Sequence, residues 1–416
     1  MRRFRAVVAV LGAAVLLGLT ACGGGASEHK TTLKLYNDKG AWKPYFQQLN
    51  ATSKKQIGLT NQPVGYTDEP TYQSFIKASF RTKNKPDLFT WQVGSQLQDI
   101  ATTGQVADTT DIWNQGVKSG DLSNDVKKYY TVDGKQYCVP LNVSYWVMFY
   151  NKKVFAEAGV KEPTSWADLM ADAQKLKAHG VTPFYQTNIL FSFVWFQQLL
   201  LGTDPQLYED LSTGKAKYTD PGVVKVMQQW KGMIDKGYMS DAGDKTDPGA
   251  LLKSGKVAMV PDGTWFNTTM SQLKMKPGSD YGTFVIPNVN PSLSTTSMAF
   301  ESGPLCSLTK APDPQASLKY LKWWVGKDAQ TTWSNSRNDV SANPKVTSTD
   351  PNLTTLTKKA NSSSTKLYLR YFEAAPPPVL TAALDGFGAF LANPGTYLKQ
   401  LQNIQQAADQ YWSQHK

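Results

Sequence analysis

The chain has 416 residues, a formal net charge of +11 and an apolar fraction of 41%. A single hydrophobic core rarely grows to this size, so the length predicts two domains. A basic chain can bind nucleic acid, but here the lysines and arginines are spread along the sequence without a long run. We therefore expect a well-packed globular protein with no nucleic-acid partner.

The N-terminal sequence predicts a location outside the cytoplasm. Three arginines within the first five residues precede an apolar run from Ala6 to Leu19. That run is shorter than the roughly 20 residues that span a bilayer, and it is typical of a signal peptide covering residues 1–21. Leu19-Thr20-Ala21-Cys22 matches the lipobox, which predicts lipidation of Cys22, a flexible tether over 22–32 and anchoring to the cell membrane.

Strand and helix patterns alternate along the mature chain. They predict strands near 33–36, 86–91 and 143–150, and helices near 42–54 and 95–103. Three more helices should open at Ser165, at Asp220-Pro221 and at Asp313-Pro314, because Ser or Asp there can supply an N-cap oxygen and Pro suits the first helical position. The alternation predicts α/β layers with mainly parallel strands.

Several chemistries have no sequence signature here. With only three histidines, and with no HExxH, GxGxxG or GxSxG motif, the sequence indicates no metal site, no cofactor and no Ser-His or Cys-His catalytic pair. Paired carboxylates for glycoside hydrolysis stay possible, because 33 acidic residues offer many pairs and no local pattern selects one.

Aromatic residues recur beside short polar ones at loop-like positions, and this mixture suits sugars. A pyranose presents apolar C–H faces to aromatic rings and hydroxyls to planar polar groups, and small-ligand pockets generally combine apolar walls with a few fixed polar groups. Trp265 follows a turn after an apolar run, which favours an exposed ring. The candidate groups are Trp91 with Gln92, Asn142 with Tyr145 and Trp146, Asn188 with Trp195, and Asp262 with Trp265.

Two thiols remain once Cys22 is lipidated. Cys138 and Cys306 form a disulfide or pack as two buried thiols, and an oxidising compartment permits the bond.

Several segments together resemble the solute-binding proteins of carbohydrate-uptake ABC transporters, the family that includes maltose-binding protein. The similarity runs in order through the lipobox, Pro86–Trp91, Asp133–Asn142, Tyr150–Phe155 with Pro163–Trp166, Gly255–Met259 with Gly263–Trp265, and Lys319–Trp333. It departs from the family pattern around Asp38, at both cysteines and at Glu301–Gly303.

This resemblance implies an α/β, two-lobed periplasmic-binding-protein fold with a hinge and a ligand cleft between the lobes. Lobe 1 would comprise 33–138 plus about 306–365, and lobe 2 would comprise 139–305 plus about 366–416. Chain crossings would lie near 138–140 and 301–306, which places both cysteines at the hinge and favours the disulfide. The implied partners are ABC transporter permease subunits, and we expect a monomer.

The resulting hypothesis is binding of a sugar, with a di- or oligosaccharide favoured, without turnover. Stacking is assigned to Trp265, Trp146 and Trp91, and hydrogen bonding to Asp262, Asn142, Gln92, Glu301 and Arg337, with the role of Asp38 open. Two alternatives stay open: a secreted glycan-cleaving enzyme, and a binder of peptides, polyols or other solutes on the same fold.

Overall fold

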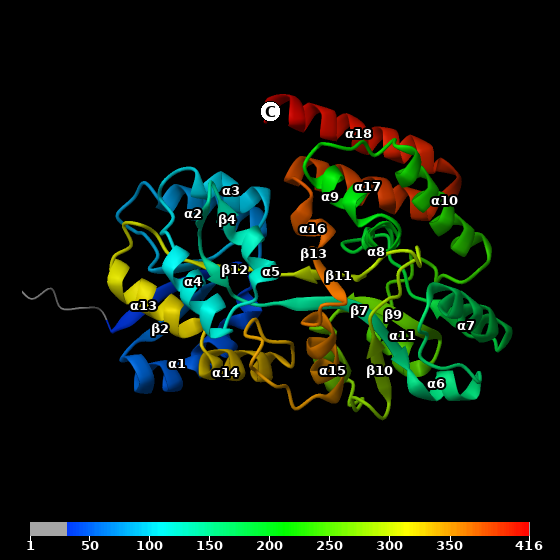
Figure 1. Cartoon of the computed structure of the whole chain (residues 1–416), viewed down its shortest axis with the longest axis horizontal. Helices are drawn as coiled ribbons and strands as arrows, with labels where there is room; N and C mark the ends of the chain where they lie inside the picture. The colour runs from blue at the N-terminus through cyan, green and yellow to red at the C-terminus, as the bar shows by residue number, and fades with distance from the viewer. Residues whose placement is uncertain (1–30, 416) are drawn as a thin grey trace, which may run out of the picture.

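The computed structural model describes residues 31–415, and the chain forms two lobes, each built on its own β-sheet (Figure 1). The predicted signal peptide, Cys22 and most of the tether lie outside the described residues. Within 31–415, no helix is both long enough and apolar enough to cross a membrane.

Lobe 1 is centred on a five-stranded sheet with the order β2-β1-β3-β12-β6. β1 runs parallel to β2 and β3, whereas β12 is antiparallel to β3 and β6. Its elements are β1 (Thr32–Asn37), η1 (Gly40–Trp42), α1 (Lys43–Ile57), β2 (Thr60–Gly65), α2 (Glu69–Ser79), β3 (Leu88–Thr90), α3 (Ser95–Ala101), α4 (Thr110–Ser119), α5 (Asn124–Lys127), η2 (Lys128–Tyr130), β4 (Thr131–Val132), β5 (Lys135–Gln136), β6 (Val139–Pro140), β12 (Pro304–Cys306), α13 (Pro314–Trp324) and α14 (Lys327–Arg337).

Lobe 2 is centred on a sheet with the order β13-β11-β7-β9-β8, in which β10 also pairs with β7. Every residue of β7 is buried, which explains its continuous apolar and aromatic sequence. Its elements are β7 (Ser144–Asn151), α6 (Lys152–Glu157), α7 (Trp166–Ala178), β8 (Thr182–Phe184), α8 (Val194–Thr203), α9 (Pro205–Ser212), α10 (Pro221–Asp235), α11 (Pro248–Ser254), β9 (Val257–Gly263), α12 (Phe266–Gln272), β10 (Tyr281–Phe284), β11 (Thr296–Glu301), α15 (Pro351–Ala360), β13 (Thr365–Leu369), α16 (Tyr371–Ala374), α17 (Pro377–Ala392), η3 (Pro394–Thr396) and α18 (Tyr397–Gln414).

The expectation of mainly parallel strands was wrong. β7 is antiparallel to β9, β10 and β11, so the second sheet is mixed. The reason is that β7 enters lobe 2 from lobe 1 rather than after a helix of its own layer, so its direction is set by the crossing.

The predicted helix starts are confirmed, with one difference in detail. Ser165 and Asp313 accept hydrogen bonds from the amides of Asp168 and Ala316, as N-caps should. Asp220 precedes α10 but makes no cap bond, because its carboxylate accepts the amide of Lys217 at 2.9 Å instead.

Two neighbouring segments carry the chain between the lobes. Residues 141–143 connect β6 to β7, and residues 302–303 connect β11 back to β12. The amide of Leu141 donates to the carbonyl of Gly303 at 2.7 Å, so the two segments are hydrogen-bonded to each other at the hinge. A later crossing follows α14; α15, which the prediction assigned to lobe 1, packs against β10 and β13 of the second sheet.

The Cys138–Cys306 disulfide predicted for the hinge is present in the structure. Both cysteines are fully buried. They lie at the lobe 1 side of the crossings, where Leu305 of β12 is opposite Val139 of β6. The bond therefore ties the two hinge strands together on the lobe 1 side.

Candidate functional site

A cavity of about 440 Å³ lies between the lobes, beside the hinge. Lobe 1 contributes residues that follow β1, and lobe 2 contributes residues around the start of α12. The last residues of β11 and α14 and the segment after β13 close the hinge side. The lining residues include Lys39, Trp42, Tyr45, Phe191, Trp265, Thr268, Gln272, Glu301, Arg337, Arg370 and Phe372. This is the position where open α/β sheets bind ligands, beyond the carboxyl ends of their strands.

Trp265 is the predicted residue most clearly exposed to this cavity. It is partly exposed, at the N-terminal end of α12, and it lines both this cavity and a second one in lobe 2. The indole folds back over the end of β9, and a Cβ at position 263 would collide with its ring nitrogen. Gly263 is therefore needed for this orientation of Trp265.

Behind Trp265 lies Trp146, which does not line either cavity. Its ring is buried and packs edge-on against Trp265 at 6.4 Å and against Phe191 at 5.3 Å between centroids. Trp146 supports the exposed rings rather than offering a face of its own.

Arg337 lies over the indole of Trp42 in the wall of the cleft. Its guanidinium carbon lies 3.9 Å from the centroid of Trp42, and its Nη2 lies 3.2 Å from Oδ2 of Asp339. Burial lowers the pKa of Arg337, while Asp339 opposes that change. Asp339 also accepts hydrogen bonds from the hydroxyls of Ser144 and Thr264, so one carboxylate after α14 joins the start of β7 and the residue that follows β9.

Glu301 pairs with Arg370, a residue that the sequence did not suggest. Nη1 of Arg370 lies 2.5 Å from Oε2 of Glu301, and its Nε donates to Glu373 at 2.8 Å. Burial lowers the pKa of Arg370, but Glu301 and Glu373 raise it by more. The arginine is therefore a fixed positive charge at the hinge end of the cleft.

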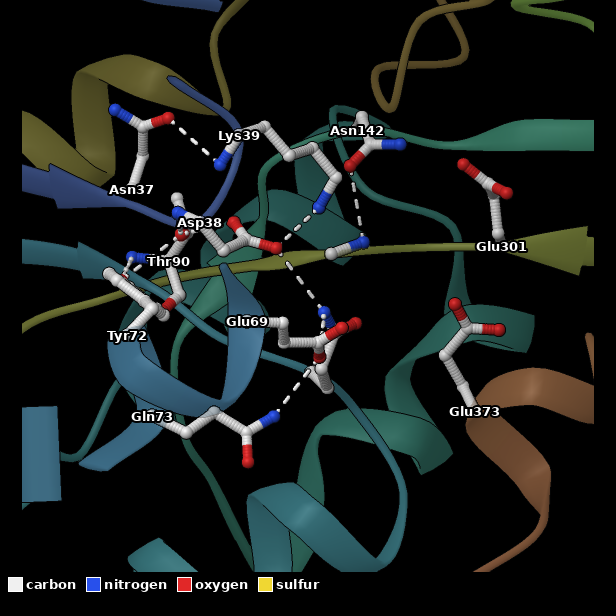
Figure 2. Close-up of polar contacts among 12 residues, drawn as sticks. Asn37, Asp38, Lys39, Glu69, Tyr72, Gln73, Thr90, Asn142, Glu301 and Glu373 are labelled. Atoms are coloured by element: carbon white, nitrogen blue, oxygen red, sulfur yellow. Dashed lines mark hydrogen bonds and ion pairs between the residues drawn. The ribbon is translucent and has the colours of Figure 1, made fainter. Parts of the chain in front are cut away.

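Asp38 and Gln92 belong to a polar network on the lobe 1 side (Figure 2). The hydroxyl of Thr90 donates to Asp38 at 2.6 Å, and Lys39 Nζ lies 2.7 Å from the same carboxylate. The Gln92 amide donates to Asp38 at 3.3 Å and to Glu69 at 3.2 Å. Figure 2 shows Glu301 and Glu373 away from this network, toward the hinge.

Asn142 lies in the hinge rather than in a cavity. Its Oδ1 accepts the amide of Gly303 at 3.2 Å (Figure 2). Its backbone carbonyl accepts the hydroxyl of Ser302 at 2.8 Å. Its side chain therefore links the two crossing segments.

Other predicted residues are turned into the cores of the lobes. Trp91 donates its indole N–H to the carbonyl of Gln96 at 2.9 Å, and Tyr145 is buried, which raises the pKa of its phenol. Trp195 is also buried and donates to the carbonyl of Tyr185, but one part of it lines the lobe 2 cavity. Asn188 lines neither cavity. Its backbone N–H donates to the carbonyl of Ala242.

Asp262 is buried at the end of β9 and lines the lobe 2 cavity. Its Oδ1 accepts the amide of Gly263 at 2.7 Å. Burial raises the pKa of this carboxyl well above its usual range, and the neighbouring Glu301 adds to the increase.

A larger cavity, of about 700 Å³, also lies between the lobes, but its walls are chiefly helices α3, α9 and α18 and no predicted ligand residue lines it. We therefore place the candidate site in the cleft beside Trp265. Among the described residues there is no group of His, Cys, Asp or Glu that could hold a metal ion.

Residues 47–360 match the family of bacterial extracellular solute-binding proteins, and the chain belongs to that family. An ABC transporter extracellular-binding protein of Pyrococcus horikoshii is 27% identical over 79% of this chain and 75% of the relative. A diacetylchitobiose-binding protein of Streptomyces coelicolor is 28% identical over 52% of this chain and 51% of the relative.

Solved structures share the fold. A bacterial solute receptor described as having an exclusive preference for β-D-galactopyranose superposes with a TM-score of 0.77 at 21% identity, covering 91% of this chain and 98% of the receptor. A chitin oligosaccharide binding protein gives a TM-score of 0.75 at 19% identity, with the same coverages.

Proposed function

We propose that this protein is the substrate-binding component of an ABC importer, that it binds a sugar or short oligosaccharide, and that it delivers the ligand intact to a membrane permease. The observation that carries the proposal is the cleft itself. Two partly exposed indoles, Trp265 and Trp42, line a cavity whose other walls carry charged groups. These groups are Lys39, Arg337, Arg370 and Glu301, and each of the three cations is paired with a carboxylate.

This arrangement suits a pyranose. Trp265 and Trp42 offer aromatic surface to the C–H faces, and the paired charges offer directed donors and acceptors to the hydroxyls. Because each cation already has a carboxylate partner, the site can hydrogen-bond a neutral ligand without leaving a buried charge uncompensated. The names of several relatives, which include sugar-binding and chitobiose-binding proteins, support the same ligand class.

Residues from both lobes line the cavity, so we expect closure around the ligand by hinge motion at 141–143 and 302–303. The ligand favours the closed form only to the extent that it binds that form more tightly. Lipidation of Cys22 would hold the protein at the outer surface of the cell membrane, beside the permease.

A thermal-shift screen over saccharides, peptides, polyols and metal ions tests the proposal, because a ligand that binds the native form raises its stability. We expect a saccharide to raise the melting temperature most. Chromatography of that saccharide after overnight incubation should recover it unchanged. Stabilisation by peptides or polyols alone, or the release of monosaccharide, would contradict the proposal.

A further inference from the structure

The second cavity, in lobe 2, adjoins the cleft and has a different character. Its volume is about 290 Å³, close to the lower limit of small-molecule pockets and suited to one sugar ring. Trp265, Leu190 and Phe191 line both cavities, so a ligand can extend from one into the other. The remaining walls of this lobe 2 pocket are aromatic to an unusual degree, with Tyr185, Trp195, Trp230 and Phe266.

The lobe 2 pocket has acidic groups and no basic ones. Asp247 and Asp262 are the charged residues that line it, and no described lysine, arginine or histidine does. Asp262 is only 5% exposed and forms no ion pair with any residue within 31–415. Asp247, at the rim, caps α11 by accepting the amide of Ala250 at 2.9 Å and is likewise without a basic partner in that range.

The adjoining cleft is the opposite in this respect. Lys39 pairs with Asp38 at 2.7 Å, Arg337 with Asp339 at 3.2 Å and Arg370 with Glu301 at 2.5 Å. Each cation of the cleft has its carboxylate within the protein, whereas the two carboxylates of the lobe 2 pocket lack a cation.

A cation from the ligand would compensate this imbalance. A buried carboxylate without a counterion is unfavourable, and the faces of indole rings attract ammonium groups. Burial raises the pKa of Asp262, with Glu301 and Asp247 adding to the increase and Arg370 opposing it. A cation held beside Asp262 would stabilise its charged form.

We propose that the lobe 2 pocket binds an ammonium group carried on a sugar ring, so that the ligand contains a hexosamine with a free amino group. This inference rests on the proposed function, since it takes the ligand to be a saccharide. It adds an orientation: the amino sugar occupies the lobe 2 pocket, and the rest of the ligand crosses Trp265 into the cleft.

Calorimetric titrations with matched sugars test whether the lobe 2 pocket binds an amino sugar. The probes are the β-1,4-linked disaccharide of glucosamine, its N-acetylated form and cellobiose, which differ only at C2, together with the hexosamine and hexose pairs of the gluco, galacto and manno series. We expect an amine-bearing probe to bind about tenfold more tightly than its neutral counterpart. Asp262→Asn should remove most of this preference, and Asp247→Asn should reduce it.

Asp247 is exposed and Asn can cap α11 as Asp does, so Asp247→Asn should fold normally. This variant keeps the test valid if the Asp262 variant is poorly folded. Asp409→Asn, an exposed change on α18 away from the pocket, is the matched control and should keep the preference. If neutral or N-acetylated probes bind as tightly as amines, the inference is overturned while saccharide binding stands. If the preference survives both pocket variants, the pocket assignment is overturned. If no saccharide binds, the proposed function itself is overturned.

Discussion

Arg370 and Glu301 meet at 2.5 Å where two parallel neighbouring strands end. β13 ends at Leu369 and β11 at Glu301, so their ion pair closes the hinge end of the cleft. Glu373 adds a second carboxylate to the same guanidinium from the first turns after β13. One cation therefore compensates two buried acids at the point where the second sheet faces the cleft.

Removal of this cation should destabilise the fold. Arg370→Met leaves Glu301 and Glu373 close together with no counterion, and breaking a buried pair in this way costs about 3–5 kcal/mol. The side chains of Arg370 and Glu301 are each 12% exposed, so solvent screens them little. Urea unfolding should show this loss in the free energy of unfolding, and adding Glu301→Gln and Glu373→Gln should recover part of it. An unchanged unfolding midpoint in Arg370→Met would contradict the role given to the pair.

Truncation of Trp265 should weaken saccharide binding by about 1–3 kcal/mol, as expected for a central aromatic contact. Trp265→Ala removes the ring that both cavities share. Trp323→Ala provides the control, because that ring is partly exposed on α13 and lines neither cavity. Equal calorimetric affinities for the two variants would remove Trp265 from the site.

The hinge disulfide should contribute strongly to stability. Cys138 and Cys306 are 168 positions apart, and closing a loop of that length in the unfolded chain corresponds to about 5 kcal/mol in the entropic treatment. The Cys138→Ser/Cys306→Ser protein should lose a large part of this free energy of unfolding. Thiol titration of the denatured, oxidised mature protein should find neither cysteine free, and two reactive thiols at these positions would be the contrary result.

Stability should depend on pH through Asp262. Burial raises the pKa of its carboxyl above the ordinary 3.8, so the folded protein holds this proton more tightly than the unfolded chain. The contribution of Asp262 to the free energy of unfolding is therefore most favourable below that value and is lost as pH rises toward the folded pKa. Asp262→Asn does not titrate, so without saccharide it should gain stability relative to the wild type as the pH rises above about 4. A stability difference between Asp262→Asn and the wild type that stays constant with pH would refute this assignment.

The sequence predicted the elements of the fold well because their signals are local. The first strand, the buried run at 143–150 and the helices after Ser165, Asp220 and Asp313 are all found in the structure. The direction of β7 was missed because it depends on the crossing between lobes, which no local pattern encodes. The disulfide was predicted because the family resemblance placed both cysteines at that crossing.

The site was harder to predict because the sequence does not show which way a side chain turns. Trp91 and Trp265 both follow strands, yet the N–H of Trp91 bonds inward to Gln96 whereas Gly263 lets Trp265 fold over the strand end. Lys39, Trp42 and Arg370 were missed. Each follows the end of β1 or β13, so a search of all residues just beyond the strand ends, rather than of aromatic clusters alone, would have found them.

The most direct test of the account is calorimetric titration of the mature protein with the saccharide that stabilises it most, repeated with Trp265→Ala. We predict saturable binding of one ligand per chain, weaker binding in the variant, and recovery of the saccharide intact. Absence of saccharide binding, or binding that Trp265→Ala leaves unchanged, would contradict a sugar site in this cleft.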